Sequence, residues 1–556
     1  MSNKDDTKKG DGASLETATD LAKAMMGFYG KALMAPQVAM SESMKLGQEM
    51  VRSATGKSTV GPMKGDKRWR DPVWLTNPAY RVMMQSYLTW CRGIEAWVDG
   101  LALSDRDKLR AKLLTGIVTD TMAPTNTLLG NPTAMKVTLE YGGQNLAKGL
   151  KQFFSDMQNN NGLPSMVDKS KFTVGENLAL SEGKVVYRED HLELLQYLPK
   201  TDTAYKTPIF IVPPQINKFY VWDLSPGRSV IEYLTSLGHQ VLIVSWRNPT
   251  AKQSDWGINS YVEALDRASE VACDISKSAS LNVIGACSGG ITAAMLIALW
   301  TARGDEKRAN TFTCLVAILD VEGGKNTTMG LFANLETLEL ARAFSGRKGV
   351  LEGKDLERTF AWLRPNDLIW AYWVNNYLIG NDPPAFDILF WNADTTNLPA
   401  GLHGDLIELL QRGGLSGEKG WEIGGHRLSL KDVKCDTFIV GGETDHITPW
   451  DGCYQSHHLF GGKSEFVLSQ AGHIQSLINP PGNPRAKFLT NDSDHQSPEE
   501  FLETAQKNKG SWWPHWMHWL NERSGKQAKA PAKFGSTKYK PMDDAPGTYV
   551  HAKAKV

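Results

Sequence analysis

The fold is indicated most clearly by the stretch Leu281-Asn282-Val283-Ile284-Gly285-Ala286-Cys287-Ser288-Gly289-Gly290. An apolar strand runs into the pattern G-x-C-x-G, and residues 291–300 then have the pattern of a helix. This order is typical of a nucleophile elbow, a sharp strand-to-helix turn that raises one side chain into a pocket. Larger side chains at the flanking glycines would clash with the neighbouring strand and helix. A cysteine where serine is usual indicates chemistry on thioesters rather than ordinary ester hydrolysis.

Strands and helices alternate on both sides of this turn. The pattern predicts helices at 229–237 and 260–277, and it predicts strands at 185–187, 192–198, 208–212, 240–246, 281–285, 312–319, 437–440 and 466–469. Such alternation implies a mostly parallel, doubly wound sheet, because parallel neighbours need crossover connections. We therefore expect an α/β-hydrolase fold with a helical cap insertion, preceded by a mainly helical N-terminal domain.

The domain organisation follows from changes in composition along the chain. We expect a variable helical, partly disordered segment at 1–60, a helical domain at 61–171 and the catalytic domain at 172–556, with the aromatic-rich cap at about 322–430. A polar run at 158–162 marks the boundary before the catalytic domain. One apolar helical face lies within the first segment, at Leu21, Met25, Met26, Tyr29, Leu33 and Met34. Packing on the protein itself is the first interpretation of that face, and adhesion to an apolar surface is the alternative.

Composition excludes several classes of function. The 61 basic and 61 acidic residues balance, so nothing favours a nucleic-acid partner. The six cysteines are scattered without zinc spacing, which indicates reduced thiols, a cytoplasmic location and no metal. No apolar run reaches the roughly 18 residues of a transmembrane segment. The seven lysines that follow Ser524 are interpreted as a solvated tail, with a binding arm as the alternative.

Two later loops predict the partners of Cys287. An α/β-hydrolase orders its triad as nucleophile, acid and histidine. Asp445 follows the strand at 437–440, and His473 follows the strand at 466–469, so both lie where the acid and the base belong. Glu443 remains an alternative acid, and His446 remains an alternative base or a supporting group.

These residues predict a covalent mechanism. The N-terminus of the helix after Cys287 and the adjacent imidazole both favour the thiolate. His473 would accept the thiol proton, while Asp445 would hold the imidazole ring in the useful tautomer. The backbone N–H groups of Ser288 and of Ile216, in the loop at 213–217, are the candidate oxyanion donors.

The surrounding motifs resemble those of the polyhydroxyalkanoate synthases. The similar segments are 211–220 (IVPPQINKFY), 245–249 (SWRNP), 285–290 (GACSGG), 445–450 (DHITPW), 472–476 (GHIQS), 479–481 (NPP) and 546–551 (PGTYVH). The similarity runs from about Arg68 to the C-terminus, and 364–370 (RPNDLIW) resembles the class II enzymes, which use medium-chain (R)-3-hydroxyacyl-CoA. The first 60 residues depart from that class.

The resemblance implies polymerisation without a cofactor. The acyl group on Cys287 would pass to the 3-hydroxyl of a growing polyester, with release of coenzyme A, and short-chain substrates remain open. It also implies a homodimer in the cytoplasm, associated with the surface of polyester granules and able to contact phasins. Ala317, Ala471 and Gln475 are candidates for substrate selectivity because we expect them to lie beside the predicted triad. The residues alone leave open a thioesterase or polyester hydrolase, or a granule-binding protein without activity.

Overall fold

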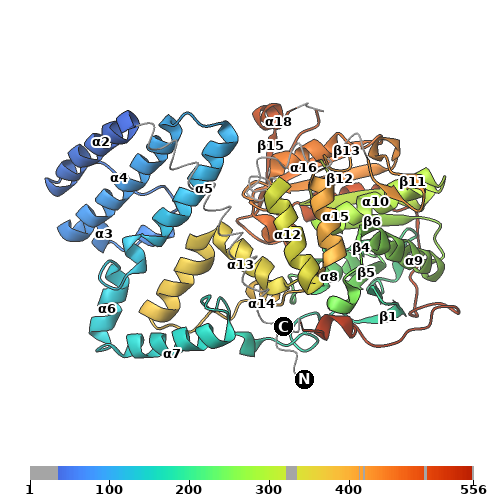
Figure 1. The fold of residues 1–556 in the computed structure, drawn as a ribbon. Helices are drawn as coiled ribbons and strands as arrows, with labels where there is room; N and C mark the ends of the chain where they lie inside the picture. Colours follow the sequence, from blue (N-terminus) through green and yellow to red (C-terminus); the bar gives the residue numbers. More distant parts are fainter. Residues whose placement is uncertain (1–35, 321–334, 412, 417–419, 494–496, 554–556) are drawn as a thin grey trace, which may run out of the picture. The chain divides into compact units, whose positions relative to one another are not determined.

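The protein forms two compact units. The computed structural model describes residues 36–320, 335–411, 413–416, 420–493 and 497–553 (Figure 1). Among these residues, one unit comprises 36–168 with 358–386, and the other comprises 169–357 with 387–553. The predicted apolar face between Leu21 and Met34 lies outside the described residues.

The predicted cap is divided between the two units. Its stretch 358–386 belongs to the first unit, whereas its described residues from 387 onward belong to the second. The transition falls inside α13 (Gly353–Leu363). The domain boundaries inferred from the sequence stay a prediction.

The first unit is helical. Its longer helices are α2 (Pro36–Ala54), α4 (Pro78–Gly100), α5 (Asp105–Thr121), α6 (Pro132–Glu140) and α7 (Gln144–Asn159). The sequence marks several helix starts, because the side chains of Asn77, Ser104 and Asn131 accept backbone N–H groups at the N-termini of α4, α5 and α6. Two π-helical turns, η8 (Asn366–Trp370) and η9 (Trp373–Leu378), complete this unit.

The second unit is built on a ten-stranded sheet in the order β1-β2-β5-β4-β6-β7-β12-β13-β14-β15. These strands are β1 (Gly183–Arg188), β2 (Leu192–Tyr197), β4 (Ile209–Val212), β5 (Val241–Trp246), β6 (Leu281–Ala286), β7 (Ala309–Leu315), β12 (Asp436–Gly442), β13 (Ser464–Ser469), β14 (Lys487–Thr490) and β15 (Gln506–Lys509). The six strands from β5 to β13 are parallel, and the two at each edge pair antiparallel. The mostly parallel sheet predicted from the sequence is therefore confirmed.

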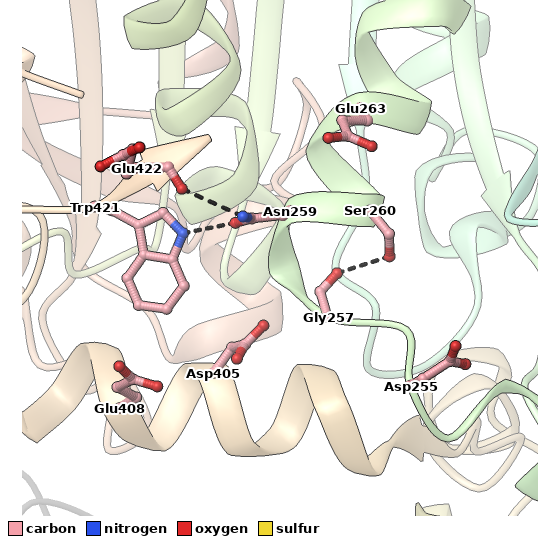
Figure 2. A pocket seen from close by; sticks show the side chains of 9 residues that line it. All are labelled: Asp255, Gly257, Asn259, Ser260, Glu263, Asp405, Glu408, Trp421 and Glu422. Atoms are coloured by element: carbon pink, nitrogen blue, oxygen red, sulfur yellow. Dashed lines mark hydrogen bonds between the residues drawn. The ribbon is translucent and has the colours of Figure 1, made fainter. Parts of the chain in front are cut away.

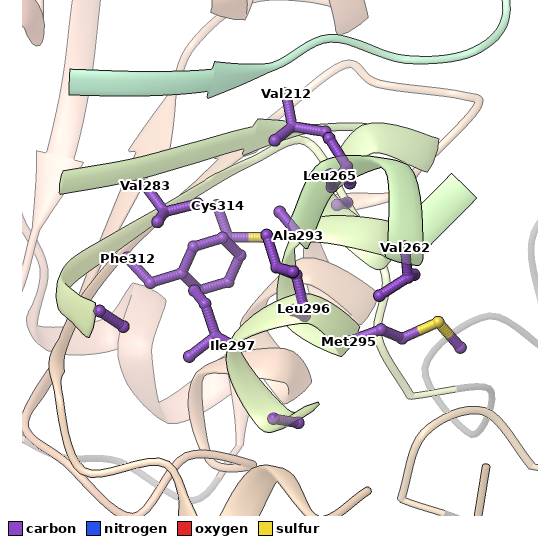
Figure 3. Close-up of a cluster of buried hydrophobic side chains, with 14 of the residues drawn as sticks. Val212, Val262, Leu265, Val283, Ala293, Met295, Leu296, Ile297, Phe312 and Cys314 are labelled. Carbon is purple, nitrogen blue, oxygen red and sulfur yellow. The ribbon is translucent and has the colours of Figure 1, made fainter. Parts of the chain in front are cut away.

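Helices cover both faces of this sheet. Every residue of β4, β5 and β6 is buried, as expected for strands covered on two sides. On one face, α9 (Ile258–Ser276) and α10 (Ser288–Ala302) pack on Val212, Val283 and Phe312 (Figure 3). On the other face, α8 (Val230–Ser236) and α19 (Trp513–Arg523) pack on the alternate side chains. The central helix α10 is apolar all round, which suits its burial.

The edge strands β14 and β15 were not predicted. The sequence of β15 is Gln-Lys-Asn-Lys, and most of its side chains are exposed, so it lacks the apolar alternation that indicates a strand. Its backbone pairing with β14, rather than side-chain burial, makes it a strand. The strand predicted at 312–319 corresponds to β7, which begins at Ala309 and ends at Leu315. It ends earlier than predicted because the chain leaves the sheet at Val316, where φ is +43°.

The C-terminal segment is anchored to the second unit. Its short strand β16 (Gln527–Lys529) pairs with β3 (Thr203–Tyr205) while keeping its side chains exposed. Further along, the backbone N–H groups of Thr548 and Tyr549 donate to the buried carboxylate of Glu193. The described lysine side chains of this segment are exposed, as a solvated segment predicts, and backbone and carboxylate hydrogen bonds hold the segment to the second unit.

Within the part of the chain that is described, no helix is both long and apolar enough to cross a membrane.

Candidate active site

Cys287 lies at the turn between β6 and α10. Its backbone has φ +50° and ψ −126°, an unusual conformation for a residue with a Cβ atom. The Cys287 N–H donates to the carbonyl oxygen of Leu315 on β7 at 3.0 Å, which fixes the turn against the neighbouring strand. Cys287 is partly exposed. The structure therefore has the strained turn that the sequence pattern indicated.

The glycines of this turn are required by close packing. A Cβ atom at Gly285 would lie 2.8 Å from Cα of Gly290. At Gly289 it would collide with the carbonyl oxygens of Val212 and Pro213. A Cβ at Gly290 would lie 2.7 Å from Cβ of Ala317. The strand and helix approach each other closely enough to admit only glycine here.

Asp445 and His473 meet although they come from different loops. Asp445 follows β12, and His473 is the first residue of α17 (His473–Leu477). Nδ1 of His473 lies 2.7 Å from Oδ2 of Asp445. The alternative acid, Glu443, is exposed and accepts a hydrogen bond from Gln470 instead. The half-buried His446 lies in the loop of Asp445, but the ring that pairs with the Asp445 carboxylate is that of His473.

The electrostatics of this pair are set by burial and by mutual attraction. Burial alone would raise the pKa of the Asp445 carboxyl, but the charge and hydrogen bond of His473, with donors from Thr448, hold that pKa below its usual value. Burial would also lower the pKa of His473, yet its pairing with Asp445 and then its interaction with Cys287 raise that pKa. The imidazole therefore interacts with both the carboxylate and the elbow cysteine.

Thr448 supports the pair and was not identified from the sequence. Its hydroxyl lies 2.8 Å from Oδ2 of Asp445 and 3.1 Å from Nδ1 of His473. It is also 3.0 Å from the carbonyl oxygen of Val316 at the end of β7. The backbone N–H groups of Ile447 and Thr448 donate to Oδ1 of Asp445. The spacing D-x-x-T, which favours such side chain-to-backbone turns, was the available signal.

The candidate oxyanion donors come from two elements. Ser288 is the first residue of α10, where backbone N–H groups have no partner within the helix. Ile216 lies in the loop after β4, with its side chain half-buried against the core. The Ser288 hydroxyl accepts the N–H of Gln215 at 3.2 Å, so the Ile216 loop is tied directly to the elbow.

The three candidate selectivity positions differ in their surroundings. Ala317 is buried and packs against the elbow at Gly290. Ala471 is half-buried, and its carbonyl oxygen accepts the N–H of Thr444. Gln475 is exposed on α17.

A cavity of about 500 Å³ is lined by residues outside the predicted triad. Figure 2 shows Asp405 and Glu408 on α15 (Ala400–Gln411) facing the start of α9. Asp405 Oδ2 accepts the N–H of Ile258 at 2.7 Å and so caps α9, whose preceding residue, Gly257, has no side chain to do this. This acidic hollow therefore has a structural explanation. Among the described residues, no cluster of three His, Cys, Asp or Glu could hold a metal ion.

Comparison with known proteins identifies the family. Residues 65–234 match the family described as the N-terminus of poly-beta-hydroxybutyrate polymerase (PhaC), and residues 208–480 match the alpha/beta hydrolase fold. Poly(3-hydroxyalkanoate) polymerase 1 of Ectopseudomonas oleovorans is 47% identical, over 96% of this chain and 94% of its own length. The chain belongs to the poly(3-hydroxyalkanoate) polymerase family.

Two further members of the polymerase family agree with this assignment. Poly(3-hydroxyalkanoate) polymerase 2 of Ectopseudomonas oleovorans is 42% identical over 98% of this chain and 99% of its own length. The polymerase subunit PhaC of Cupriavidus necator is 37% identical over 90% of this chain and 85% of its own length. The resemblance inferred from the motifs, the α/β-hydrolase fold and the helical N-terminal region are all confirmed, and the chain is an enzyme of the polymerase type.

Proposed function

We propose that this enzyme joins (R)-3-hydroxyacyl groups from coenzyme A thioesters into polyhydroxyalkanoate, with Cys287, His473 and Asp445 as its catalytic residues. One observation carries the proposal: the buried His473 ring pairs with Asp445 at 2.7 Å and interacts electrostatically with the elbow cysteine, in a chain of the polymerase family. That arrangement suits a nucleophile, a base and an orienting acid.

The first half-reaction loads the cysteine. The Cys287 sulfur forms a bond to the carbonyl carbon of the acyl-CoA, and the thiol proton passes to His473. The carbonyl oxygen becomes an oxyanion, which the N–H groups of Ser288 and Ile216 stabilise. When this intermediate collapses, the bond to coenzyme A breaks, and the leaving sulfur takes the proton from His473. One thioester is exchanged for another, so this step is nearly isoenergetic.

The second half-reaction extends the polyester. His473 accepts the proton of a 3-hydroxyl group, and the hydroxyl oxygen attacks the acyl-cysteine carbonyl. An ester bond forms, the bond to Cys287 breaks, and the proton returns from His473 to the sulfur. Asp445 stabilises the imidazolium in both halves, and its carboxylate can assist activation of the hydroxyl. No cofactor or metal is needed for these steps.

The proposed substrates are medium-chain acyl groups, with short-chain groups as a second class. Support comes from the class II-like motif at 364–370 and from the identity to the Ectopseudomonas oleovorans polymerases. Ala317, Ala471 and Gln475 are the proposed selectivity positions.

The test incubates the purified enzyme with (R)-3-hydroxybutyryl-CoA or (R)-3-hydroxyoctanoyl-CoA. We expect coenzyme A release together with insoluble polyester, faster from the octanoyl substrate, and neither product from Cys287→Ala. Coenzyme A release without polyester would instead indicate a thioesterase or hydrolase. A Cys287→Ala variant that still makes polymer would overturn the assignment of the nucleophile.

We also propose that the enzyme works as a cytoplasmic homodimer at the surface of polyester granules, where it can contact phasins. Dimerisation and phasin contact rest on the family resemblance. Granule association has additional support from α2, where the side chains of Met40, Met44 and Val51 are each more than half exposed. At 100° per residue these three positions lie on one narrow stripe of the helix.

Triple substitution of this stripe, M40Q/M44Q/V51Q, tests the granule proposal in a polymer-producing host. We expect the variant to shift from the granule fraction to the soluble fraction while keeping its rate of coenzyme A release. Unchanged partitioning would reject α2 as the contact. Light scattering of the purified enzyme tests the dimer, and a monomer that polymerises at full rate would reject it.

A further inference from the structure

The loop that carries Ile216 is held from two sides at the preceding residue. The Gln215 N–H donates to the hydroxyl of Ser288 at 3.2 Å, and the Gln215 carbonyl oxygen accepts the hydroxyl of Thr396 at 3.0 Å. Because the peptide group is planar and trans, the Gln215 carbonyl and the Ile216 N–H point in opposite directions. A hydrogen bond that fixes the carbonyl therefore also fixes the direction of the Ile216 N–H.

Thr396 is itself held rigidly. Its side chain is buried, and the next residue, Asn397, makes three hydrogen bonds. The Asn397 N–H donates to Oδ1 of Asn248 at 3.0 Å, and its side-chain amide donates to the carbonyl oxygen of Pro249 at 3.1 Å. Asn397 Oδ1 accepts the N–H of Gly353, also at 3.1 Å. The Thr396 hydroxyl thus has a fixed position relative to the loops after β4 and β5.

Other contacts brace the same loop farther from the elbow. The Lys218 ammonium lies 2.8 Å from Asp394, and the Lys218 carbonyl oxygen accepts the indole N–H of Trp391 at 2.7 Å. Residues 391–397 therefore follow the loop along its length. Among these contacts, the hydrogen bond from the Thr396 hydroxyl is the one made to the Gln215–Ile216 peptide group, which contains the candidate oxyanion donor.

We propose that Thr396 is a positioning residue for polymerisation, whose hydroxyl directs the Ile216 N–H toward the acyl oxygen on Cys287. This inference rests on the proposed function. During acylation the sulfur–carbon bond forms while the carbonyl electron pair moves onto oxygen, so the charge there is largest in the transition state. A correctly directed N–H contributes most at that point and little to binding of the uncharged carbonyl.

The decisive comparison uses the full chain with Thr396→Val, which keeps the shape and removes the hydroxyl, and Thr396→Ser, which keeps the hydroxyl. Loss of a whole oxyanion donor costs about a hundredfold or more in kcat, so loss of its orientation should cost about tenfold. We expect that fall in kcat for Thr396→Val with KM within about twofold of wild type, and near wild-type kcat for Thr396→Ser. If Thr396→Val does not fold, Thr396→Ala carries the same comparison.

Alkylation of Cys287 by iodoacetamide separates orientation from general distortion. Iodide is displaced at a tetrahedral carbon and no oxyanion forms, so Thr396→Val should be alkylated at the wild-type rate. The matched control is Thr235→Val, which removes another buried hydroxyl, one that bonds the Ile231 carbonyl within α8, and it should retain kcat.

Three outcomes would overturn the role of Thr396. These are an unchanged kcat in Thr396→Val, a parallel loss of acylation and alkylation, and an equal loss of kcat in Thr396→Ser. Failure of the proposed function looks different, because the enzyme would then release coenzyme A without forming polyester, or Cys287→Ala would still make polymer, whichever residue stands at 396.

Discussion

Nδ1 of His473 lies 2.7 Å from Oδ2 of Asp445, although 28 residues separate them in the chain. Both side chains are almost fully buried, and Cys287 also contributes to the raised pKa of the ring. Removing any member of such a group should alter the titration of the others as well as the rate.

Replacement of Asp445 by Asn should lower kcat about a hundredfold or more, because the neutral amide stabilises the imidazolium poorly. Since the Asp445 charge raises the pKa of His473, that pKa should fall in Asp445→Asn. The limb of the pH–rate profile that reports His473 should move to lower pH when coenzyme A release is measured. Glu443→Gln is the control and should keep the wild-type profile, and an unshifted limb in Asp445→Asn would contradict this coupling.

Replacement of Thr448 by Val should lower kcat about tenfold, because a hydrogen bond to a charged group is lost. That hydrogen bond lowers the pKa of Asp445, so its loss should raise this pKa and move the acid limb of the pH–rate profile upward. Thr448→Ser keeps the hydroxyl and should restore both rate and profile. A purely structural role predicts lower stability in Thr448→Val with an unshifted acid limb, which is the result that would exclude the proposed effect.

Iodoacetamide near neutral pH should modify Cys287 before any other thiol. Burial raises the pKa of the other five, which are Cys91, Cys273, Cys314, Cys435 and Cys453. Mass spectrometry of peptides should find one early site of modification, with loss of activity at the same rate. The control is Cys314→Ala, which should label like wild type, whereas Cys287→Ala should lose the early site. Inactivation that tracks labelling of another cysteine would refute the selectivity.

Acid should destabilise the second unit through His239. Burial lowers the pKa of this histidine to about 4, against a weaker opposing effect of Asn521. The unfolded chain takes up the proton near pH 6.5 and the folded protein only near pH 4, so stability falls as the pH drops between these values. The loss should be about 2 kcal/mol between pH 7.5 and pH 5.

Urea unfolding at the two pH values measures this loss. His239→Gln should show a smaller difference between them, and His518→Gln, at an exposed histidine, should match wild type. Equal pH dependence in all three proteins would exclude His239 as the source.

Local patterns accounted for the elbow and for the loops that carry the candidate acid and base. A strand followed by G-x-C-x-G needs no distant contact to be recognised, because the glycines and the change of periodicity lie within ten residues. Asp445 and His473 could be placed for a similar reason, since each follows an apolar strand. The edge strand β15 could not be predicted from the sequence, because its polar residues show no alternation with apolar ones. Its pairing with β14 makes it a strand.

The amino-acid sequence by itself therefore determined the nucleophile turn, the alternating architecture and the family. Only the tertiary structure decided which carboxylate meets His473, that Thr448 supports this pair, and that Thr396 lies on the loop of Ile216. The physical reason is distance along the chain. The hydrogen bond from Thr396 to Gln215 joins residues that are 181 positions apart in the sequence. A single hydroxyl group produces no repeating sequence pattern from which its partner could be predicted.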